Sequence, residues 1–333
     1  MIVVTGAAGF IGSNLVKALN GRGERDVVAV DNLANAEKVK NLADLDIADF
    51  IDKREFIARI EDGRYSAKPV ALMHQGACSD TMESDGRYMM ENNYDYSMKL
   101  MRWCAERKVP FIYASSASVY GAGREFSEVR SHESPLNVYG YSKFLFDQAV
   151  RRALASGPLP AQVAGFRYFN VYGPREAHKG RMASVAYHFY NQYLQNGKVK
   201  LFEGSAGYAS GEQLRDFVSV DDVVKVNLFF LDHPASSGIF NVGTGRAESF
   251  NEVARATINA VRATRGEKAL ALADLRSAGA IEYVPFPPQL VGKYQSYTQA
   301  DLTRLRKAGY GESFLGVEEG VGRYVKARAA AAV

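Results

Sequence analysis

The feature that constrains this chain most is a glycine-rich turn, Gly6-Ala7-Ala8-Gly9-Phe10-Ile11-Gly12, which follows the short apolar run Ile2–Thr5. Apolar residues then recur at helical spacing, at Ile11, Leu15, Ala18 and Leu19. Glycines allow a tight turn and let backbone N–H groups approach a pyrophosphate, and the N-terminus of a helix adds partial positive charge. Glycines also serve ordinary turns, but between a strand and a helix they predict a dinucleotide-binding βαβ unit.

Short β-branched runs alternate with helical patterns through the first half of the chain. These runs are Ile2–Thr5, Val27–Val30, Val70–His74, Phe111–Ser115 and Gln162–Phe169. Continuous apolar strands separated by helices indicate a parallel sheet covered on both faces. We therefore predict an α/β fold with a Rossmann-type, doubly wound parallel sheet.

The chain has 333 residues, enough for a nucleotide-binding domain and a smaller second region. The alternation weakens after Gly173-Pro174, and helical spacing returns at Asn251–Thr264. We expect Asp216–Phe230 and Ile239–Val242 to rejoin the sheet. The predicted division is a dinucleotide-binding domain of residues 1–170, rejoined by about 214–246, and a smaller α/β C-terminal substrate-binding domain of 171–213 and 247–333.

Composition narrows the possible partners. The formal charge is +4 and no dense Lys/Arg run is present, so we expect small anionic molecules rather than nucleic acid as partners. No basic or long apolar segment precedes the first strand, and no membrane span is expected, which favours a cytoplasmic location. Cys78 and Cys104 do not have the spacing of a metal site, so we expect two reduced thiols and no metal.

The choice between NAD and NADP depends on the end of the second predicted strand. Asp31 lies about 20 residues beyond the glycine-rich turn, where a carboxylate can accept a hydrogen bond from the adenosine ribose, and this alone favours NAD. Asn32 follows it, and Lys38 and Lys53 lie downstream, where a basic group can meet the 2′-phosphate of NADP. The alternative is that both lysines are ordinary solvated residues.

A candidate reaction centre follows the fourth predicted strand. Tyr139-Gly140-Tyr141-Ser142-Lys143 places a lysine one helical turn after a tyrosine, so the two side chains share a face. Ser115–Gly121 lies at the carboxyl edge of the sheet, where α/β proteins bind ligands. The alternative is a serine-rich strand end beside a structural aromatic residue, but the dinucleotide motif upstream favours catalysis.

The tyrosine must become a better base to act near neutral pH. A phenol has an ordinary pKa of about 10, and we expect the Lys143 ammonium and the positive charge of a nicotinamide to lower the pKa of Tyr139. Ser116, Tyr139 and Lys143 are therefore predicted to form a proton-transfer group.

These motifs, taken together, resemble the extended short-chain dehydrogenase/reductase family over essentially the whole chain. They are the N-terminal glycines, Ser115–Gly121, Tyr139–Lys143, Phe166–Pro174 and Arg215–Val218. Within that family, five further segments resemble the group of enzymes that epimerises ADP-linked heptoses at C6. These segments are His74–Ser79, Tyr88–Tyr94, Pro135–Asp147, Arg175–Gly180 and Tyr297–Leu302.

The resemblance implies a cofactor and a set of contacts. One tightly bound NADP per subunit is expected, which overrides Asp31 as a marker of NAD. The implied cofactor contacts are Gly6, Gly9, Phe10, Ile11, Gly12, Asp31, Asn32, Lys38, Lys53, Gln75, Gly76, Ala77, Cys78, Ser79, Asn92, Tyr139, Lys143, Val171 and Lys179. The implied substrate contacts are Ser116, Asn170, Arg181, His188, Phe202, Glu203, Gly204, Ser205, Arg215 and Tyr294.

The resemblance also implies a reaction and an assembly. The expected reaction oxidises the heptose of ADP-heptose to a C6 ketone and reduces it again from the opposite face, as a step in making lipopolysaccharide precursors. Lys179 is the implied second proton donor beside Tyr139, although judged alone a lysine in a polar loop is more often solvated. A homo-oligomer is expected, either a pentamer or a pair of pentamers.

Three other functions remain open. A UDP-hexose 4-epimerase shares the serine, tyrosine and lysine, so only the substrate motifs oppose it. A 4,6-dehydratase is less favoured, because Ala117-Ser118 replaces the acidic pair of those enzymes. A nucleotide-sensing protein without turnover is also compatible with the fold, but it has no need of Ser116, Tyr139 and Lys143 together.

Overall fold

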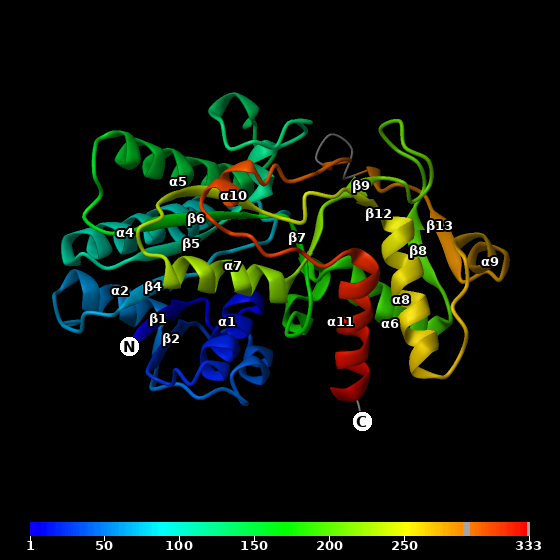
Figure 1. The fold of residues 1–333 in the computed structure, drawn as a ribbon, viewed down its shortest axis with the longest axis horizontal. Helices are drawn as coiled ribbons and strands as arrows, with labels where there is room; N and C mark the ends of the chain where they lie inside the picture. The colour runs from blue at the N-terminus through cyan, green and yellow to red at the C-terminus, as the bar shows by residue number, and fades with distance from the viewer. Residues whose placement is uncertain (289–293, 332–333) are drawn as a thin grey trace.

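In the computed structural model, which describes residues 1–288 and 294–331, the centre of the molecule is a seven-stranded sheet (Figure 1). Its strand order is β11-β6-β5-β4-β1-β2-β3, and every neighbouring pair is parallel. The strands are β1 (Ile2–Thr5), β2 (Val27–Asp31), β3 (Asp49–Asp52), β4 (Ala71–His74), β5 (Phe111–Ser116), β6 (Val163–Tyr168) and β11 (Gly238–Val242). All five strands predicted in the first half are confirmed, with ends that differ by one residue or none.

Helices cover both faces of this sheet. One apolar cluster joins the strands to α1 (Phe10–Gly21) and α7 (Val220–Asp232). The cluster on the other face contains Phe56 of α2 (Lys53–Glu61), Trp103 of α4 (Tyr96–Arg107) and Phe146 of α5 (Val138–Ala155). Strands β1, β2, β4, β5 and β6 are buried along their whole length, as a doubly wound parallel sheet requires. The predicted fold class is therefore confirmed.

Two details of the sheet differ from the prediction. Strand β3 was not predicted, because Asp49 and Asp52 are exposed at the sheet edge and break the apolar pattern. Asp216–Phe230 was expected to rejoin the sheet, and this is wrong for its strand. That strand, β10 (Phe217–Ser219), pairs with β7 (Asn170–Tyr172) outside the sheet, and the chain then enters α7, which packs on α1. Ile239–Val242 does join the sheet, pairing in β11 with β6.

A second apolar core lies beside the sheet, in the right part of Figure 1. It is built on the parallel pair β8 (Val199–Phe202) and β13 (Ile281–Val284). Four helices complete it, namely α6 (Val185–Asn196), α8 (Phe250–Thr264), α9 (Leu272–Ser277) and α11 (Val317–Ala331). The predicted helix Asn251–Thr264 is confirmed as α8, whose N-cap Ser249 accepts a hydrogen bond from the Glu252 N–H.

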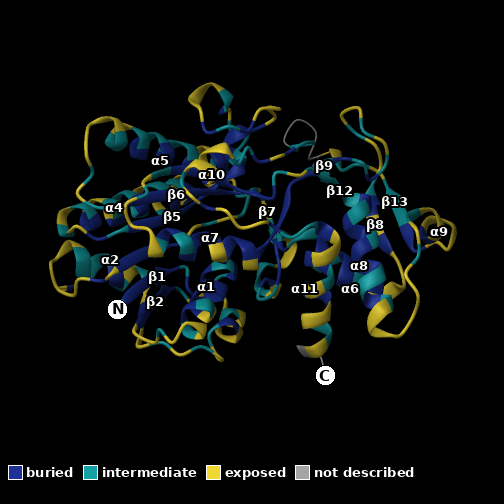
Figure 2. Cartoon of the chain, viewed as in Figure 1, coloured by how far each residue is buried: buried dark blue, intermediate teal, exposed yellow. Residues whose placement is uncertain are grey.

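Several short elements complete the fold. They are α3 (Gly86–Met90), α10 (Thr303–Lys307) and the antiparallel pair β9 (Leu214–Arg215) and β12 (Glu248–Ser249). Of these, α3 packs on α5 and α10 packs on β11. Figure 2 shows buried residues along the seven-stranded sheet and on the inner sides of the helices that cover the sheet and form the second core. Exposed residues lie at the turns.

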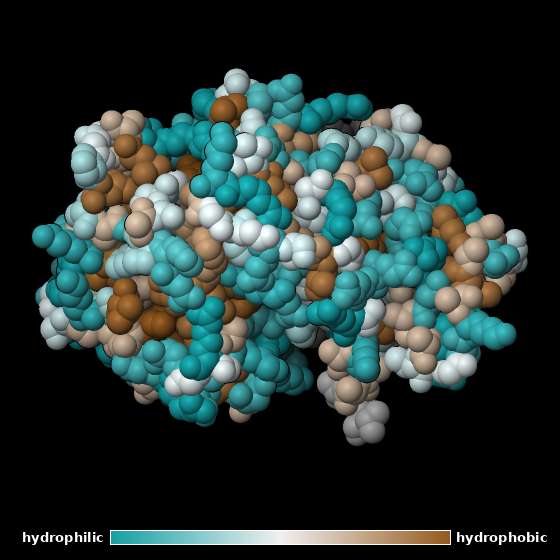
Figure 3. Space-filling view, in the orientation of Figure 1, coloured by the Kyte–Doolittle hydropathy of each residue, from teal (hydrophilic) through white to brown (hydrophobic). Residues whose placement is uncertain are grey.

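The surface is mixed in character. The face in Figure 3 carries hydrophilic side chains over most of its area, with brown apolar patches between them. Large exposed apolar residues on the described surface include Val70, Val39 and Leu194. No helix in the described ranges is both long enough and apolar enough to cross a lipid bilayer.

Candidate functional site

A cavity of about 540 Å³ opens at the carboxyl ends of the parallel strands. Its size is typical of sites for small molecules and cofactors. Every residue predicted to contact the cofactor lines this cavity, and so do the four predicted catalytic residues Ser116, Tyr139, Lys143 and Lys179. The fold thus brings together groups that lie more than a hundred residues apart in the sequence.

The floor of the cavity is the glycine-rich turn between β1 and α1. Gly6 has a φ of 69°, and a Cβ on this residue would lie 2.5 Å from the Gly76 nitrogen. A Cβ on Gly12 would lie 2.1 Å from the Gly6 carbonyl oxygen. Gly9 is the N-cap of α1 and supplies no capping side chain, so the first-turn N–H groups are left for an anion. This cradle fits a pyrophosphate.

Asp31 at the end of β2 is committed to contacts within the protein. Its carboxylate accepts hydrogen bonds from the Ala8 N–H at 2.8 Å and the Asn32 N–H at 2.7 Å. It also pairs with the Lys38 ammonium, at 3.0 Å. Asp31 therefore anchors the glycine-rich turn and holds Lys38 at the cavity, rather than presenting a free carboxylate.

Positive charge is concentrated at this end of the cavity. Lys53 donates to the Asn92 side-chain oxygen at 2.5 Å, and burial together with the charges of Arg54 and Lys38 lowers its pKa. Burial and the charges of Lys38 and Lys179 likewise lower the pKa of His178. Cations that lower the pKa values of their neighbours are well placed to gain from a phosphate.

The loop Gln75–Ser79 is fixed by the helix that follows it. A π-helical turn, Glu91–Asp95, directs Asn92 into the cavity and lets Asn93 reach under the loop. Asn93 accepts from the Cys78 N–H at 2.8 Å and donates to the Cys78 carbonyl at 2.9 Å. Gln75 accepts a hydrogen bond from the Tyr168 hydroxyl at 3.0 Å. The Gln75 amide group also donates to the Asn227 side-chain oxygen, at 3.1 Å.

The candidate reaction centre joins the end of β5 to the first turns of α5. Asn137 caps α5 by accepting a hydrogen bond from the Gly140 N–H at 2.8 Å. This start places Tyr139 and Lys143 on the face of α5 that borders the cavity, beside Ser116. The Lys143 ammonium donates to the Ala114 carbonyl at 2.8 Å. Burial lowers the pKa of Lys143 to about 8.

The pKa of Tyr139 differs in direction from the prediction. Burial raises the pKa of this phenol, and a hydrogen bond with Ser116 only partly opposes that rise. The predicted lowering combined the Lys143 ammonium with the positive charge of a bound nicotinamide, and it stays a prediction for the protein with its cofactor. In the protein alone, burial therefore has the largest effect on the Tyr139 pKa.

Lys179 reaches the cavity from the loop after β7. It lies in a 3₁₀ segment, Ala177–Met182, and its ammonium is 5.3 Å from the centroid of the Phe10 ring. Burial lowers the pKa of Lys179. The side chain is therefore not the solvated surface lysine that the residue type alone suggests.

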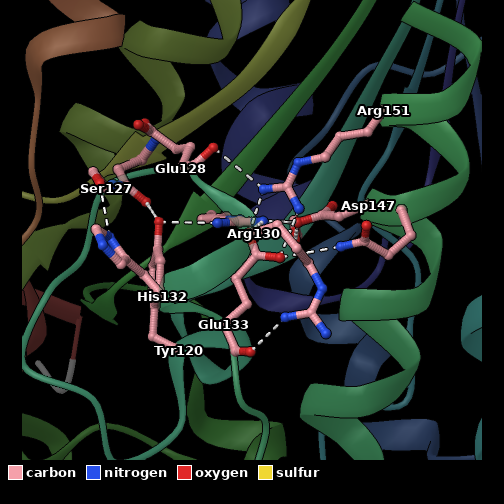
Figure 4. Close-up of polar contacts among 12 residues, drawn as sticks. Tyr120, Ser127, Glu128, Arg130, His132, Glu133, Asp147 and Arg151 are labelled. Atoms are coloured by element: carbon pink, nitrogen blue, oxygen red, sulfur yellow. Dashed lines mark hydrogen bonds and ion pairs between the residues drawn. The ribbon is translucent and has the colours of Figure 1, made fainter. Parts of the chain in front are cut away.

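A buried charge network lies beneath the reaction centre (Figure 4). Asp147, one turn after Lys143 on α5, accepts hydrogen bonds from Tyr113 at 2.9 Å, Ser115 at 3.0 Å and Arg167 at 2.9 Å. Glu133 pairs with Arg167 and Arg151. The network fastens α5 to β5 and β6, and thereby fixes Tyr139 relative to Ser116. Sequence analysis missed it, although a charged residue inside the apolar strand around Arg167 is a readable signal.

The predicted substrate contacts do not line one cavity together, as the predicted cofactor contacts do. The Arg215 guanidinium lies 4.6 Å from the centroid of the Tyr294 ring. Phe286 bridges Tyr294 and Phe202, with ring centroids 5.3 and 5.5 Å apart. Burial lowers the pKa of Arg215. These residues form an aromatic group around one buried cation.

The other predicted substrate contacts lie apart from this aromatic group. Of all the substrate predictions, only Ser116 lines the cavity within the described residues. Arg181 is exposed and pairs with Asp80 at 2.6 Å, while the His188 ring packs against Tyr187. Asn170, Glu203 and Gly204 are exposed, and Ser205 accepts a hydrogen bond from Gln213 at 3.0 Å.

Several lining residues were not predicted from the sequence. They include Thr5, Asp80, Tyr88, Tyr96, Tyr168, Phe169, His178 and Met182. Asp80 and His178 adjoin predicted residues, and this proximity was the available signal. Within residues 1–288 and 294–331, no group of three His, Cys, Asp or Glu side chains is placed to hold a metal ion.

The doubly wound parallel sheet, with its cavity at the carboxyl ends of the strands, agrees with the family to which the sequence is matched. The model of the NAD dependent epimerase/dehydratase family matches residues 2–243, and the chain belongs to that family.

Three similar proteins show which members of the family this chain resembles. The chain is 64% identical over 324 residues to the ADP-L-glycero-D-manno-heptose-6-epimerase of Thiobacillus denitrificans, covering 97% of each chain. It is similar to the crystal structure of the ADP-L-glycero-D-manno-heptose-6-epimerase of Helicobacter pylori, with 31% identity, a TM-score of 0.79 and coverage of 99% and 96%. The UDP-glucose 4-epimerase of Thermus thermophilus, solved with NAD, gives 28% identity, a TM-score of 0.76 and coverage of 98% and 97%.

Proposed function

We propose that this protein converts ADP-D-glycero-D-manno-heptose into ADP-L-glycero-D-manno-heptose by inverting C6 of the heptose through a transient C6 ketone. The observation that carries the proposal is the convergence of Ser116, Tyr139, Lys143 and Lys179 on the cavity formed by the glycine-rich turn. The identity of 64% to the enzyme of Thiobacillus denitrificans supports the choice of substrate. The product is a precursor for lipopolysaccharide.

The chain's own residues supply proton transfer and orientation. When bound, the nicotinamide supplies reversible hydride transfer with C6. Tyr139 takes the proton of the C6 hydroxyl as that carbon is oxidised and returns it on reduction. Ser116 donates a hydrogen bond to the same oxygen, and Lys143 keeps positive charge beside the phenolate. Because Lys143 is anchored to the Ala114 carbonyl, its ammonium stays in register with Tyr139.

Lys179 is proposed as the second acid/base group. The ketone must present its opposite face before reduction, so its oxygen moves to the other side of the site, where the fixed Tyr139 phenol cannot follow. Lys179 enters the cavity from a separate loop, and burial lowers its pKa, as a proton-exchanging lysine requires. The two groups then each serve one epimer.

NADP is the proposed cofactor, one per subunit. Lys38 and Lys53 border the cavity near the end of β2, and the pairing of Lys38 with Asp31 neutralises the carboxylate that would repel a 2′-phosphate. The adjacent His178 adds a further hydrogen-bonding group.

Arg215 is proposed to grip the diphosphate of the substrate, with Tyr294 and Phe202 beside it. A guanidinium can bind a diphosphate bidentately, and its burial increases the gain from that contact. We further propose that residues 171–213 and 247–333 form the substrate-binding domain, supported by their separate apolar core. A cytoplasmic homo-oligomer, either a pentamer or a pair of pentamers, completes the proposal.

The direct test is incubation of the protein, as purified, with ADP-D-glycero-D-manno-heptose and no added cofactor. Chromatographic separation of the two epimers is expected to show the L-glycero product approaching equilibrium with the substrate. Formation of no product, with or without added NADP, would contradict the proposal.

A UDP-hexose 4-epimerase is the second candidate, favoured by the similar structure of the UDP-glucose 4-epimerase of Thermus thermophilus. Incubation with UDP-galactose tests it, since a 4-epimerase forms UDP-glucose. A protein that binds NADP but turns over neither sugar nucleotide would instead be a nucleotide sensor.

A further inference from the structure

We propose that Glu176 is a positioning residue for Lys179: its buried carboxylate closes the loop of residues 173–184 and holds the Lys179 ammonium in the cavity. The inference rests on the proposed function, in which Lys179 serves one of the two epimers. Glu176 lies outside the cofactor and substrate predictions, and it does not line the cavity.

Glu176 joins the two ends of the loop that carries Lys179. Its carboxylate accepts a hydrogen bond from the Gly173 N–H at 3.3 Å, at the start of the loop. At the end of the loop it accepts from the Ser184 N–H at 2.5 Å and the Ser184 hydroxyl at 2.8 Å. Only 1% of Glu176 is exposed, so these three donors take the place of water.

The opposite side of the loop is tied to α1 and to the segment that follows β2. Arg175 donates to the Asn41 carbonyl at 2.6 Å and pairs with Asp44 at 2.5 Å. Asn14 of α1 donates to the Pro174 carbonyl at 2.9 Å. Glu176 is thus the counterpart of Arg175. Arg175 fastens the loop to the segment after β2, and Glu176 fastens it to α6, which begins after Ser184.

The backbone of this loop needs such anchors. Arg175 has a φ of 72° and Gly180 a φ of 53°, both in the left-handed region. A non-glycine residue in that region costs on the order of 1–3 kcal/mol and persists where its surroundings enforce it. Without the Glu176 carboxylate, the loop would lose its closure toward α6, and the Lys179 ammonium would lose its fixed place beside Phe10.

Glu176 affects Lys179 through its negative charge, in addition to closing the loop through its hydrogen bonds. Burial lowers the pKa of Lys179, and the negative charge of Glu176 opposes that change. The Phe10 ring of α1 lies beside the Lys179 ammonium. The neighbouring His178 is affected by the charges of Lys179, Lys38 and Asp31. Tyr324 of α11 faces Glu176 from the other side, and burial and this charge raise its pKa.

Two variants separate closure from charge. Glu176→Gln keeps the size of the side chain but removes its charge and sets an amide donor against backbone N–H donors. Ser184→Ala removes one hydroxyl donor and leaves the charge. Lys179→Met is the reference for loss of the second acid/base group. Circular dichroism and ADP affinity, which are expected to be unchanged, check that each variant is folded.

The measurement is pre-steady-state reduction of bound NADP by each epimer separately, followed at 340 nm across pH. Lys179→Met should impair one epimer only. Glu176→Gln should slow the same epimer by about 10-fold and leave the other within about 2-fold, because misplacing one catalytic group costs rate without removing it. Since that lysine acts as a base in oxidation, and the Glu176 charge raises its pKa, the rise in rate with pH should move to lower pH in Glu176→Gln and stay in place in Ser184→Ala.

Hydrogen–deuterium exchange gives a readout besides activity. Amides in residues 173–184 should exchange faster in Glu176→Gln than in the parent protein. If Lys179→Met impairs both epimers equally, the two-base function is wrong. If Lys179→Met is selective while Glu176→Gln slows both epimers equally, or neither, the positioning role of Glu176 is overturned.

Discussion

The cofactor side and the substrate side of the proposed site are built in different ways. On the cofactor side, backbone turns at the ends of β1, β2 and β4 shape the cavity, and buried hydrogen bonds such as that from Ala8 to Asp31 hold them. On the substrate side, Phe202, Arg215 and Tyr294 come from separate segments, and stacking among side chains gathers their rings and the guanidinium.

This difference has consequences for function. The cofactor side, formed by backbone turns and buried charges, fixes the reacting groups tightly, so a change to one of those reacting groups should reduce turnover. A side formed by stacked side chains adjusts more easily, so a change there should weaken binding while turnover at saturation survives. The variants below test that contrast.

Tyr139→Phe should have the largest effect. It removes the acid/base hydroxyl but keeps the ring, so kcat is expected to fall by roughly 10²–10⁴-fold with the cofactor still bound. Initial rates of epimerisation and absorbance of bound cofactor measure the two quantities. Tyr141→Phe on the same helix is the matched control, because Tyr141 is 46% exposed, and its rate should match the parent. A nearly unchanged rate in Tyr139→Phe would exclude this residue as the base.

Lys179→Met should come next, with a loss of kcat on the order of 10²-fold. The reason is that one epimer loses its acid/base group while Tyr139 still serves the other. Dismutation of a C6-aldehyde analogue that lacks C7 needs no rotation of the carbonyl, so this reaction should survive better than epimerisation. Normal turnover at saturation with much weaker binding of the ADP-sugar would instead make Lys179 a phosphate ligand.

Features encoded by contiguous motifs could be predicted from the sequence, whereas features that depend on tertiary packing could not. Strands such as Ile2–Thr5 and the glycine-rich turn are contiguous motifs, so local pattern was enough to predict them and to place Tyr139 and Lys143 at the sheet edge. The Asp147–Arg167 pair joins α5 to β6, whose proximity depends on packing, and no local pattern encodes it. The raised pKa of Tyr139 was missed for the same reason, because burial is a tertiary property.

Arg215→Met should raise KM for the ADP-sugar by roughly 100-fold, with kcat changed little, because a charge-assisted contact contributes about 1.5–3 kcal/mol. Steady-state kinetics over a wide substrate range measures both constants. Arg215→Lys keeps the charge but loses the bidentate geometry, so its KM should lie between that of the parent protein and that of Arg215→Met. A fall in kcat with an unchanged KM would show that the substrate side is as tightly coupled to the chemistry as the cofactor side.

Replacement of the two lysines on the cofactor side should have the smallest effect, and it can rank them. Both Lys38→Met and Lys53→Met should weaken NADP by roughly 10-fold relative to NAD, the low end for a charge-assisted phosphate contact. Lys38→Met should favour NAD more strongly, because it also frees the Asp31 carboxylate, now paired at 3.0 Å, to repel a 2′-phosphate and to accept from a ribose hydroxyl. Titration of the cofactor-free protein with NADP and NAD gives the affinity ratio, and Lys40→Met, an exposed residue of the same segment that pairs with Glu37, is the control. Equal preference for the two cofactors in the parent protein would contradict the assignment of NADP, whereas a larger shift in Lys53→Met would place the phosphate nearer Asn92 than Asp31.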